Sequence, residues 1–135
     1  MITQINHIGI AVNSLEERIP FYRDVLRLKM IGTEEVPDQK VRVAFFEVGE
    51  VHIELLEPIN GEGPIAKFIE KRGAGIHHMC YRVSNVQSKM DELIAKGYKF
   101  LYEEPRKGAN NCLVNFMHPK SGGGVLIELS QKMED

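Results

Sequence analysis

The sequence predicts an α+β fold in which two pseudo-symmetric βαβββ modules form one curled mixed sheet. Strands containing His7 and His78 open the two halves, and an amphipathic helical pattern follows each of them. Strands with a central glutamate, Glu54 and Glu128, close the halves. The histidines are 71 positions apart and the glutamates 74, so the halves differ little in length. Since two such small units cannot each hold an independent core, we expect one domain over residues 1–135, with the curled sheets enclosing a cleft.

A short linker helix separates the modules. The first module covers about residues 4–58 and the second about residues 75–131. Pro64 suits the first position of a helix over residues 64–72, because the N–H that proline lacks would be unpaired there. Gly73 then ends this helix.

The first module shows a strand, a kinked helix and three further strands. Ser14 can cap the helix, and Pro20 should kink it or restart it. Gly49 and Glu50 suit a tight hairpin. The apolar stripe of the helix is Leu15, Ile19, Tyr22 and Leu26; the strands cover residues 5–12, 29–33, 41–48 and 51–57, with a loop over 34–40.

The second module repeats this order. Ser84 or Asn85 can cap its helix, and Gly97 ends it. The apolar stripe of the helix is Val86, Met90, Leu93 and Ile94; the strands cover residues 76–83, 98–102, 111–117 and 124–130, with loops over 103–110 and 118–123.

Composition limits the function classes. The 135 residues are 43% apolar with a net charge of −2, so no basic surface indicates nucleic-acid binding. The N-terminus does not have the pattern of a signal peptide, and no apolar run approaches the roughly 20 residues of a membrane span. Cys80 and Cys112 form no CxxC motif, so we expect reduced thiols. The expected location is the cytoplasm, without a nucleic-acid or membrane partner.

Two histidines and two glutamates at repeated positions are candidate ligands of one divalent ion. Glu54 and Glu128 lie within apolar strands, where a carboxylate is costly unless a cation or several donors pair with it. Two imidazoles and two carboxylates suit zinc, cobalt, nickel, manganese or iron(II). The candidate metal ligands are His7, Glu54, His78 and Glu128.

The other histidines are weaker candidates. A lone strand histidine is more often a hydrogen-bonded core residue than a ligand. The repeat favours His78 over His77, and adjacent strand residues face opposite ways. His52 has Leu126 as its counterpart in the second half, so we interpret His52 as structural or peripheral. His118 lies in a loop, either bordering the cleft or serving only as a turn residue.

Seven segments, in order and without a large insertion, carry a family resemblance. They are residues 7–12 (HIGIAV), 54–58 (ELLEP), 64–68 (PIAKF), 75–78 (GIHH), 104–108 (EPRKG), 118–120 (HPK) and 124–129 (GVLIEL). With them the chain resembles the vicinal oxygen chelate superfamily, which includes glyoxalase I, extradiol dioxygenases and fosfomycin-resistance enzymes. Within that superfamily it is most similar to the methylmalonyl-CoA epimerases. The linker helix and the Glu-Pro-Arg and His-Pro-Lys segments favour this family, because they are not general superfamily features.

The resemblance implies a cofactor and a reaction. One divalent ion, cobalt first with manganese, nickel or zinc as alternatives, would bind to His7, Glu54, His78 and Glu128. Relatives carry glutamine or glutamate at the second position, so Glu54 fits. The reaction would interconvert (2R)- and (2S)-methylmalonyl-CoA, between propionyl-CoA and succinyl-CoA, through an enolate that the ion stabilises. Glu128 is the candidate catalytic residue, as a ligand that also acts as a base. A homodimer is usual for the group.

The chain departs from some of these relatives at one catalytic position. Where they carry a glutamate assigned as a base, this chain has Val43, which cannot transfer a proton. Glu47 shares the strand parity of Val43 and is a weaker candidate. The second acid or base is therefore left open.

Two alternative functions use the same fold. A glyoxalase I-like lyase would have similar ligands and would convert the hemithioacetal of glutathione and methylglyoxal. A non-enzymatic binding module, as in bleomycin-resistance proteins, would lack bound metal and activation by metal. A dioxygenase is disfavoured, because a fourth protein ligand at Glu54 leaves fewer positions open for O₂.

Overall fold

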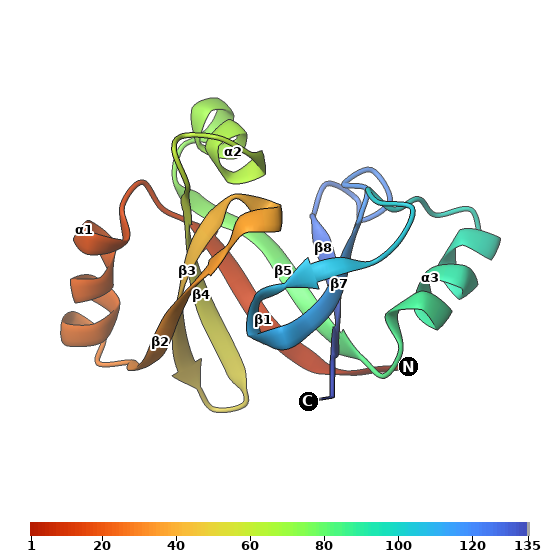
Figure 1. Cartoon of the computed structure of the whole chain (residues 1–135), viewed down its shortest axis with the longest axis horizontal. Helices are drawn as coiled ribbons and strands as arrows, with labels where there is room; N and C mark the ends of the chain where they lie inside the picture. Colours follow the sequence, from red (N-terminus) through yellow and green to blue (C-terminus); the bar gives the residue numbers. More distant parts are fainter. Residues whose placement is uncertain (135) are drawn as a thin grey trace. The chain divides into compact units, whose positions relative to one another are not determined.

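The computed structural model describes residues 1–134 and consists of two compact units (Figure 1). We call His7–His77 the first unit. The second unit is Met1–Asn6 together with the chain from His78 onward. No helix in this described part of the chain has the length and hydrophobicity of a membrane span.

The first unit contains a four-stranded sheet, two α-helices and a short 3-10 helix over Pro37–Gln39. Its strands, in sheet order, are β2 (Lys29–Val36), β3 (Val41–Val48), β4 (Val51–Pro58) and, from His7 on, β1 (Ile2–Ala11). β1 runs parallel to β4, and the other neighbours are antiparallel. The helices are α1 (Leu15–Pro20), which continues as a π-helical turn over Phe21–Val25, and α2 (Pro64–Arg72).

The second unit repeats this arrangement. Its strands, in sheet order, are β5 (Gly75–Val83), β8 (Ile127–Lys132), β7 (Cys112–Met117) and β6 (Arg106–Gly108), and its helix is α3 (Val86–Ala95). β5 runs parallel to β8, and the other neighbours are antiparallel. The βαβββ order expected from the sequence is therefore present in each unit.

Each unit has a hydrophobic cluster between a helix and one face of its own sheet. In the first unit, Leu15 of α1 packs with Phe46 and Leu55 of the strands. In the second, Val86 of α3 packs with Leu129. Because successive strand residues alternate between faces, the residues next to these core positions line the face opposite the helix.

Local sequence signals explain how the helices begin and bend. Ser14 Oγ accepts the Glu17 N–H at 3.3 Å, and Asn85 Oδ1 accepts the Ser88 N–H at 2.8 Å, so Asn85 is the cap of α3. α1 ends at Pro20, which lacks a backbone N–H, and the wider π-helical turn follows it. The predicted disturbance at Pro20 is confirmed.

The strand expected over residues 98–102 is wrong, since only one β-bridge forms there, at Phe100. The Asn115 side chain bonds both the backbone N–H and C=O of Tyr102, at 3.3 and 2.9 Å, where a strand ladder would otherwise continue. The edge strand β6 instead lies within the loop expected over residues 103–110.

Other strand boundaries also differ from the expectation: β1 begins at Ile2 rather than residue 5, and β8 ends at Lys132 rather than residue 130. The last strand begins at Ile127 rather than at residue 124, because Gly123 and Gly124 have φ angles of 66° and 95° and belong to a turn. β2 extends to Val36, into the loop expected over residues 34–40. Its charged residues are compatible with an edge strand, which they protect from further pairing.

Candidate metal-binding and catalytic site

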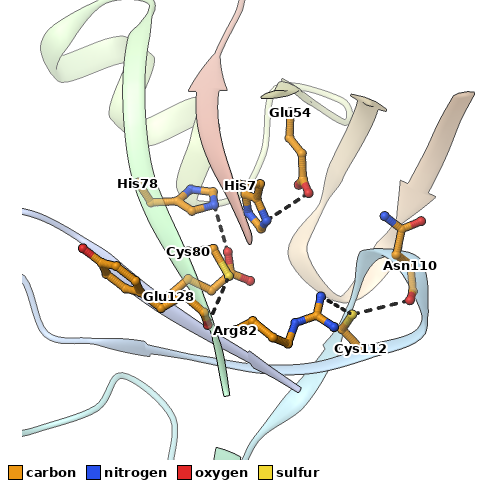
Figure 2. Close-up of polar contacts among 9 residues, drawn as sticks. His7, Glu54, His78, Cys80, Arg82, Asn110, Cys112 and Glu128 are labelled. Carbon is orange, nitrogen blue, oxygen red and sulfur yellow. Dashed lines mark hydrogen bonds and ion pairs between the residues drawn. The ribbon is translucent and has the colours of Figure 1, made fainter. Parts of the chain in front are cut away.

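The first unit brings His7 and Glu54 together on the sheet face opposite α1 (Figure 2). In the parallel register of β1 and β4, Gly9 lies opposite Glu54, so His7 lies two residues back on the same face. His7 Nδ1 is 3.0 Å from Glu54 Oε2. Both residues are buried, with 6% of their surface exposed.

The second unit forms the corresponding pair from His78 and Glu128. Cys80 lies opposite Glu128 in the parallel register of β5 and β8, as Gly9 lies opposite Glu54. His78 Nε2 is 2.9 Å from Glu128 Oε1 (Figure 2), and both residues are 5% exposed. The sequence repeat is therefore also a repeat of strand register and of side-chain pairing.

A phenylalanine lies beside each glutamate in the antiparallel ladder. Phe45 is the register partner of Glu54, and Phe116 is the register partner of Glu128. The Phe116 ring meets the His78 ring edge to face, with 5.7 Å between centroids. An apolar ring of this kind fixes the imidazole orientation and lowers the local dielectric constant.

Each His–Glu pair has donor chemistry that fits a divalent metal ion. Ligand atoms about 2.1 Å from an octahedral ion, at right angles to each other, are about 3.0 Å apart. The nitrogen–oxygen distances of 3.0 and 2.9 Å have this value. A nitrogen and a carboxylate oxygen from each unit also match the mixed donors that cobalt, zinc, nickel and manganese accept.

The other histidines lie in different surroundings. His77 packs edge to face on Phe68 of α2, at 4.9 Å, and has the opposite strand parity to His78. His52 lies opposite His7 in the strand register and is partly buried. His118 accepts the Lys120 backbone N–H at 3.2 Å within a turn, which matches the turn role considered for it.

The two positions considered for a second base differ in burial. Val43 is 1% exposed, and its register partner on β4 is Leu56. Glu47 is exposed, near the hairpin between β3 and β4, opposite His52. Glu47 therefore lies in solvent at the end of the ladder, whereas Glu54 is buried.

Two residues that the sequence analysis did not single out anchor the helices to the glutamate strands. Glu57 Oε1 accepts the Leu15 N–H at 2.8 Å, and Gln131 Oε1 accepts the Val86 N–H at 2.9 Å. Each acceptor lies three residues after the paired glutamate of its unit. A polar residue three positions after each glutamate was the sequence signal that could have predicted these two helix contacts.

A protein-family model described as the Glyoxalase/Bleomycin resistance protein/Dioxygenase superfamily matches residues 6–116. The chain belongs to this superfamily. The predicted vicinal oxygen chelate fold is confirmed by two solved superfamily structures. The methylmalonyl-CoA epimerase of Mycobacterium tuberculosis has a TM-score of 0.94 and 38% identity, over 98% of this chain and 90% of that one. A variant of the Streptomyces coelicolor methylmalonyl-CoA epimerase, in complex with 2-nitronate-propionyl-CoA, has a TM-score of 0.93 and 33% identity, over 98% and 96%.

A curated superfamily relative matches over an equally large share of the chain. The ethylmalonyl-CoA/methylmalonyl-CoA epimerase of Cereibacter sphaeroides is 41% identical over 133 residues, which are 97% of this chain and 99% of that protein. The resemblance to methylmalonyl-CoA epimerases within the superfamily is therefore confirmed along the whole chain.

Proposed function

We propose that this protein is a methylmalonyl-CoA epimerase, which interconverts (2R)- and (2S)-methylmalonyl-CoA. One observation carries the proposal: the chain is 38–41% identical, over nearly its whole length, to proteins of that name, and it has a buried His–Glu pair in each unit. The acyl-CoA substrate, a place between propionyl-CoA and succinyl-CoA, a homodimeric state and a cytoplasmic location belong to the same proposal.

The proposed cofactor is one divalent ion bound by His7, Glu54, His78 and Glu128, with cobalt preferred over manganese, nickel and zinc. The register repeat and the two nitrogen–oxygen distances support this ligand set. Bound there, the ion would act as a Lewis acid toward the oxygen on which negative charge develops.

Glu128 is the proposed base that removes the proton at C2. Its carboxylate is buried beside Phe116, with Oε1 at 2.9 Å from His78 Nε2, and a positioned carboxylate can act as a general base. Proton removal next to a thioester gives a planar enolate. A nitronate is likewise planar at carbon with its negative charge on oxygen, so the complex of the Streptomyces coelicolor relative with 2-nitronate-propionyl-CoA supports this type of intermediate.

Exchange of the C2 proton with solvent deuterium tests the proposal. We expect the wild-type protein with added cobalt to deuterate methylmalonyl-CoA at C2 and to produce the opposite epimer. Glu16→Gln is the control, since Glu16 is an exposed residue of α1. Absence of exchange, together with turnover of the hemithioacetal of glutathione and methylglyoxal, would replace the epimerase with a glyoxalase I-like lyase.

A further inference from the structure

Arg82 lies on the same sheet face as the His78–Glu128 pair. Along β5, His78, Cys80 and Arg82 alternate with residues that face α3, such as Val83. Arg82 lies opposite Ser130 on β8, one step beyond Cys80 and Glu128. The side chain extends from β5 toward Cys112 on β7 (Figure 2).

The guanidinium group of Arg82 has little protein hydrogen bonding. Among residues 1–134, its only polar side-chain contact is from Nη2 to Cys112 Sγ, at 3.8 Å. Its Nε is buried, and none of residues 1–134 offers that atom an acceptor. No carboxylate in the same described range forms an ion pair with it.

The polar group in contact with the guanidinium, the Cys112 thiol, is neutral. Cys112 Sγ donates to the backbone carbonyl of Asn110 at 3.4 Å, and Lys132 Nζ donates to the same oxygen at 2.6 Å. Cys112 and Lys132 are register partners. The Asn110 carbonyl is therefore bonded directly by Lys132, and Arg82 reaches it only through the Cys112 thiol.

A partly buried guanidinium without an anion is costly, because dehydration is not offset by an ion pair. Its planar fork of N–H groups suits a carboxylate or a phosphate, which can accept two parallel hydrogen bonds. We propose that Arg82 binds an oxyanion of the acyl-CoA substrate. The identity of the ligand rests on the proposed function.

The spacing along β5 allows one ligand to contact both Arg82 and Glu128. Arg82 follows Cys80, the register partner of Glu128, by two residues, which is about 6.6 Å of strand. Methylmalonyl-CoA carries a carboxylate on the reacting carbon and phosphates at the other end of its pantetheine arm. The carboxylate and the phosphates can each accept two hydrogen bonds from the Arg82 guanidinium. Binding of truncated ligands that carry only one of these groups shows which of them Arg82 binds.

Calorimetric binding of methylmalonyl-CoA to the full-length protein tests the proposal without using turnover. We expect Arg82→Met to raise the Kd about 10- to 100-fold, which is the usual loss for a charge-assisted hydrogen bond. Arg82→Lys should recover part of the affinity, because it keeps the charge without the fork. Arg23→Met is the matched control, since Arg23 is exposed and paired with Asp24. The thermal stability of Arg82→Met should equal or exceed that of the wild type, because an apolar side chain replaces a partly buried cation.

The same titration with CoA and with methylmalonyl-pantetheine identifies the oxyanion. If a phosphate binds Arg82, Arg82→Met weakens CoA binding and leaves methylmalonyl-pantetheine unchanged; if the carboxylate binds, the reverse holds. Equal Kd values for wild type and Arg82→Met with all three ligands would overturn the proposal while leaving the epimerase intact. If Arg82→Met binds methylmalonyl-CoA more weakly than the wild type, but the wild type exchanges no C2 proton, only the epimerase function would be overturned.

Discussion

The two units share one scaffold but differ in the side chains placed along it. In each, a histidine strand lies parallel to a glutamate strand, and the helix is anchored three residues after the glutamate. Two and four residues after the histidine, the first unit has Gly9 and Ala11, whereas the second has Cys80 and Arg82. The comparison indicates that the repeat supplies two equivalent His–Glu pairs, while the second unit supplies additional chemical groups beside its pair.

The outer edges of the two sheets also differ. In the first unit, β2 pairs along β3 over eight residues, with one irregularity between Met30 and Gly32. In the second, the corresponding edge is interrupted, and residues 101–106 line a pocket of about 450 Å³. Arg106 covers the Tyr102 ring there, at 3.9 Å from its centroid. The interrupted edge therefore forms a pocket with a charged side chain, where a continuous strand would occupy the space.

Substitution of the paired glutamates should give the largest functional difference between the two units. We expect Glu128→Gln to slow C2 deuterium exchange about 10²- to 10⁴-fold, because an amide cannot act as the base. Glu54→Gln should cost less than about tenfold, since an amide oxygen still binds a metal and relatives of this kind carry glutamine there. Comparable losses in the two variants, measured at saturating cobalt, would contradict the assignment of the base to Glu128.

Removal of the Asn115 amide should affect stability rather than chemistry. The register aligns Asn115 with Ala44, which needs no amide because β2 continues beside it. Asn115→Leu leaves two backbone groups of Tyr102 without partners, and should lower the free energy of unfolding by about 2 kcal/mol. Asn115→Asp is the control that keeps the acceptor and loses the donor. Urea unfolding measures the difference, and an unchanged midpoint for Asn115→Leu would show that the amide does not hold the edge.

The helix anchors should give the smallest effects. Gln131→Ala should lower the free energy of unfolding by about 1 kcal/mol, the usual value for a helix N-terminal acceptor. Glu57→Ala should lower it by about 1–2 kcal/mol, because Glu57 also accepts a hydrogen bond from Arg42 at 3.3 Å. Denaturant titration of both variants ranks them, and a larger loss in Gln131→Ala would reverse the expected order.

Much of the fold follows from local sequence signals. The boundaries of β3 and α2 agree with the prediction, because Gly49 and Gly73 end these segments whatever the tertiary context. The interrupted edge could not be predicted, since residues 98–102 have strand-like composition and the Asn115 side chain that replaces the ladder is distant in sequence.

The candidate site divides in the same way. The two His–Glu pairs follow from the repeat, because equal spacing implies equal register. The Arg82 environment could not be read from the sequence, since arginine is usually solvated and only the packing of three strands shows a guanidinium without an acceptor for its Nε. Binding of one ion by all four ligands remains a prediction.

Metal content of the purified protein tests that central claim most directly. Elemental analysis after cobalt loading and desalting should give one ion per wild-type chain. His7→Ala and His78→Ala should each lose most of that ion on desalting, because the three ligands that remain bind it more weakly than four. Two ions per wild-type chain, or retention of the metal when either histidine is replaced, would contradict a single site shared by the two units.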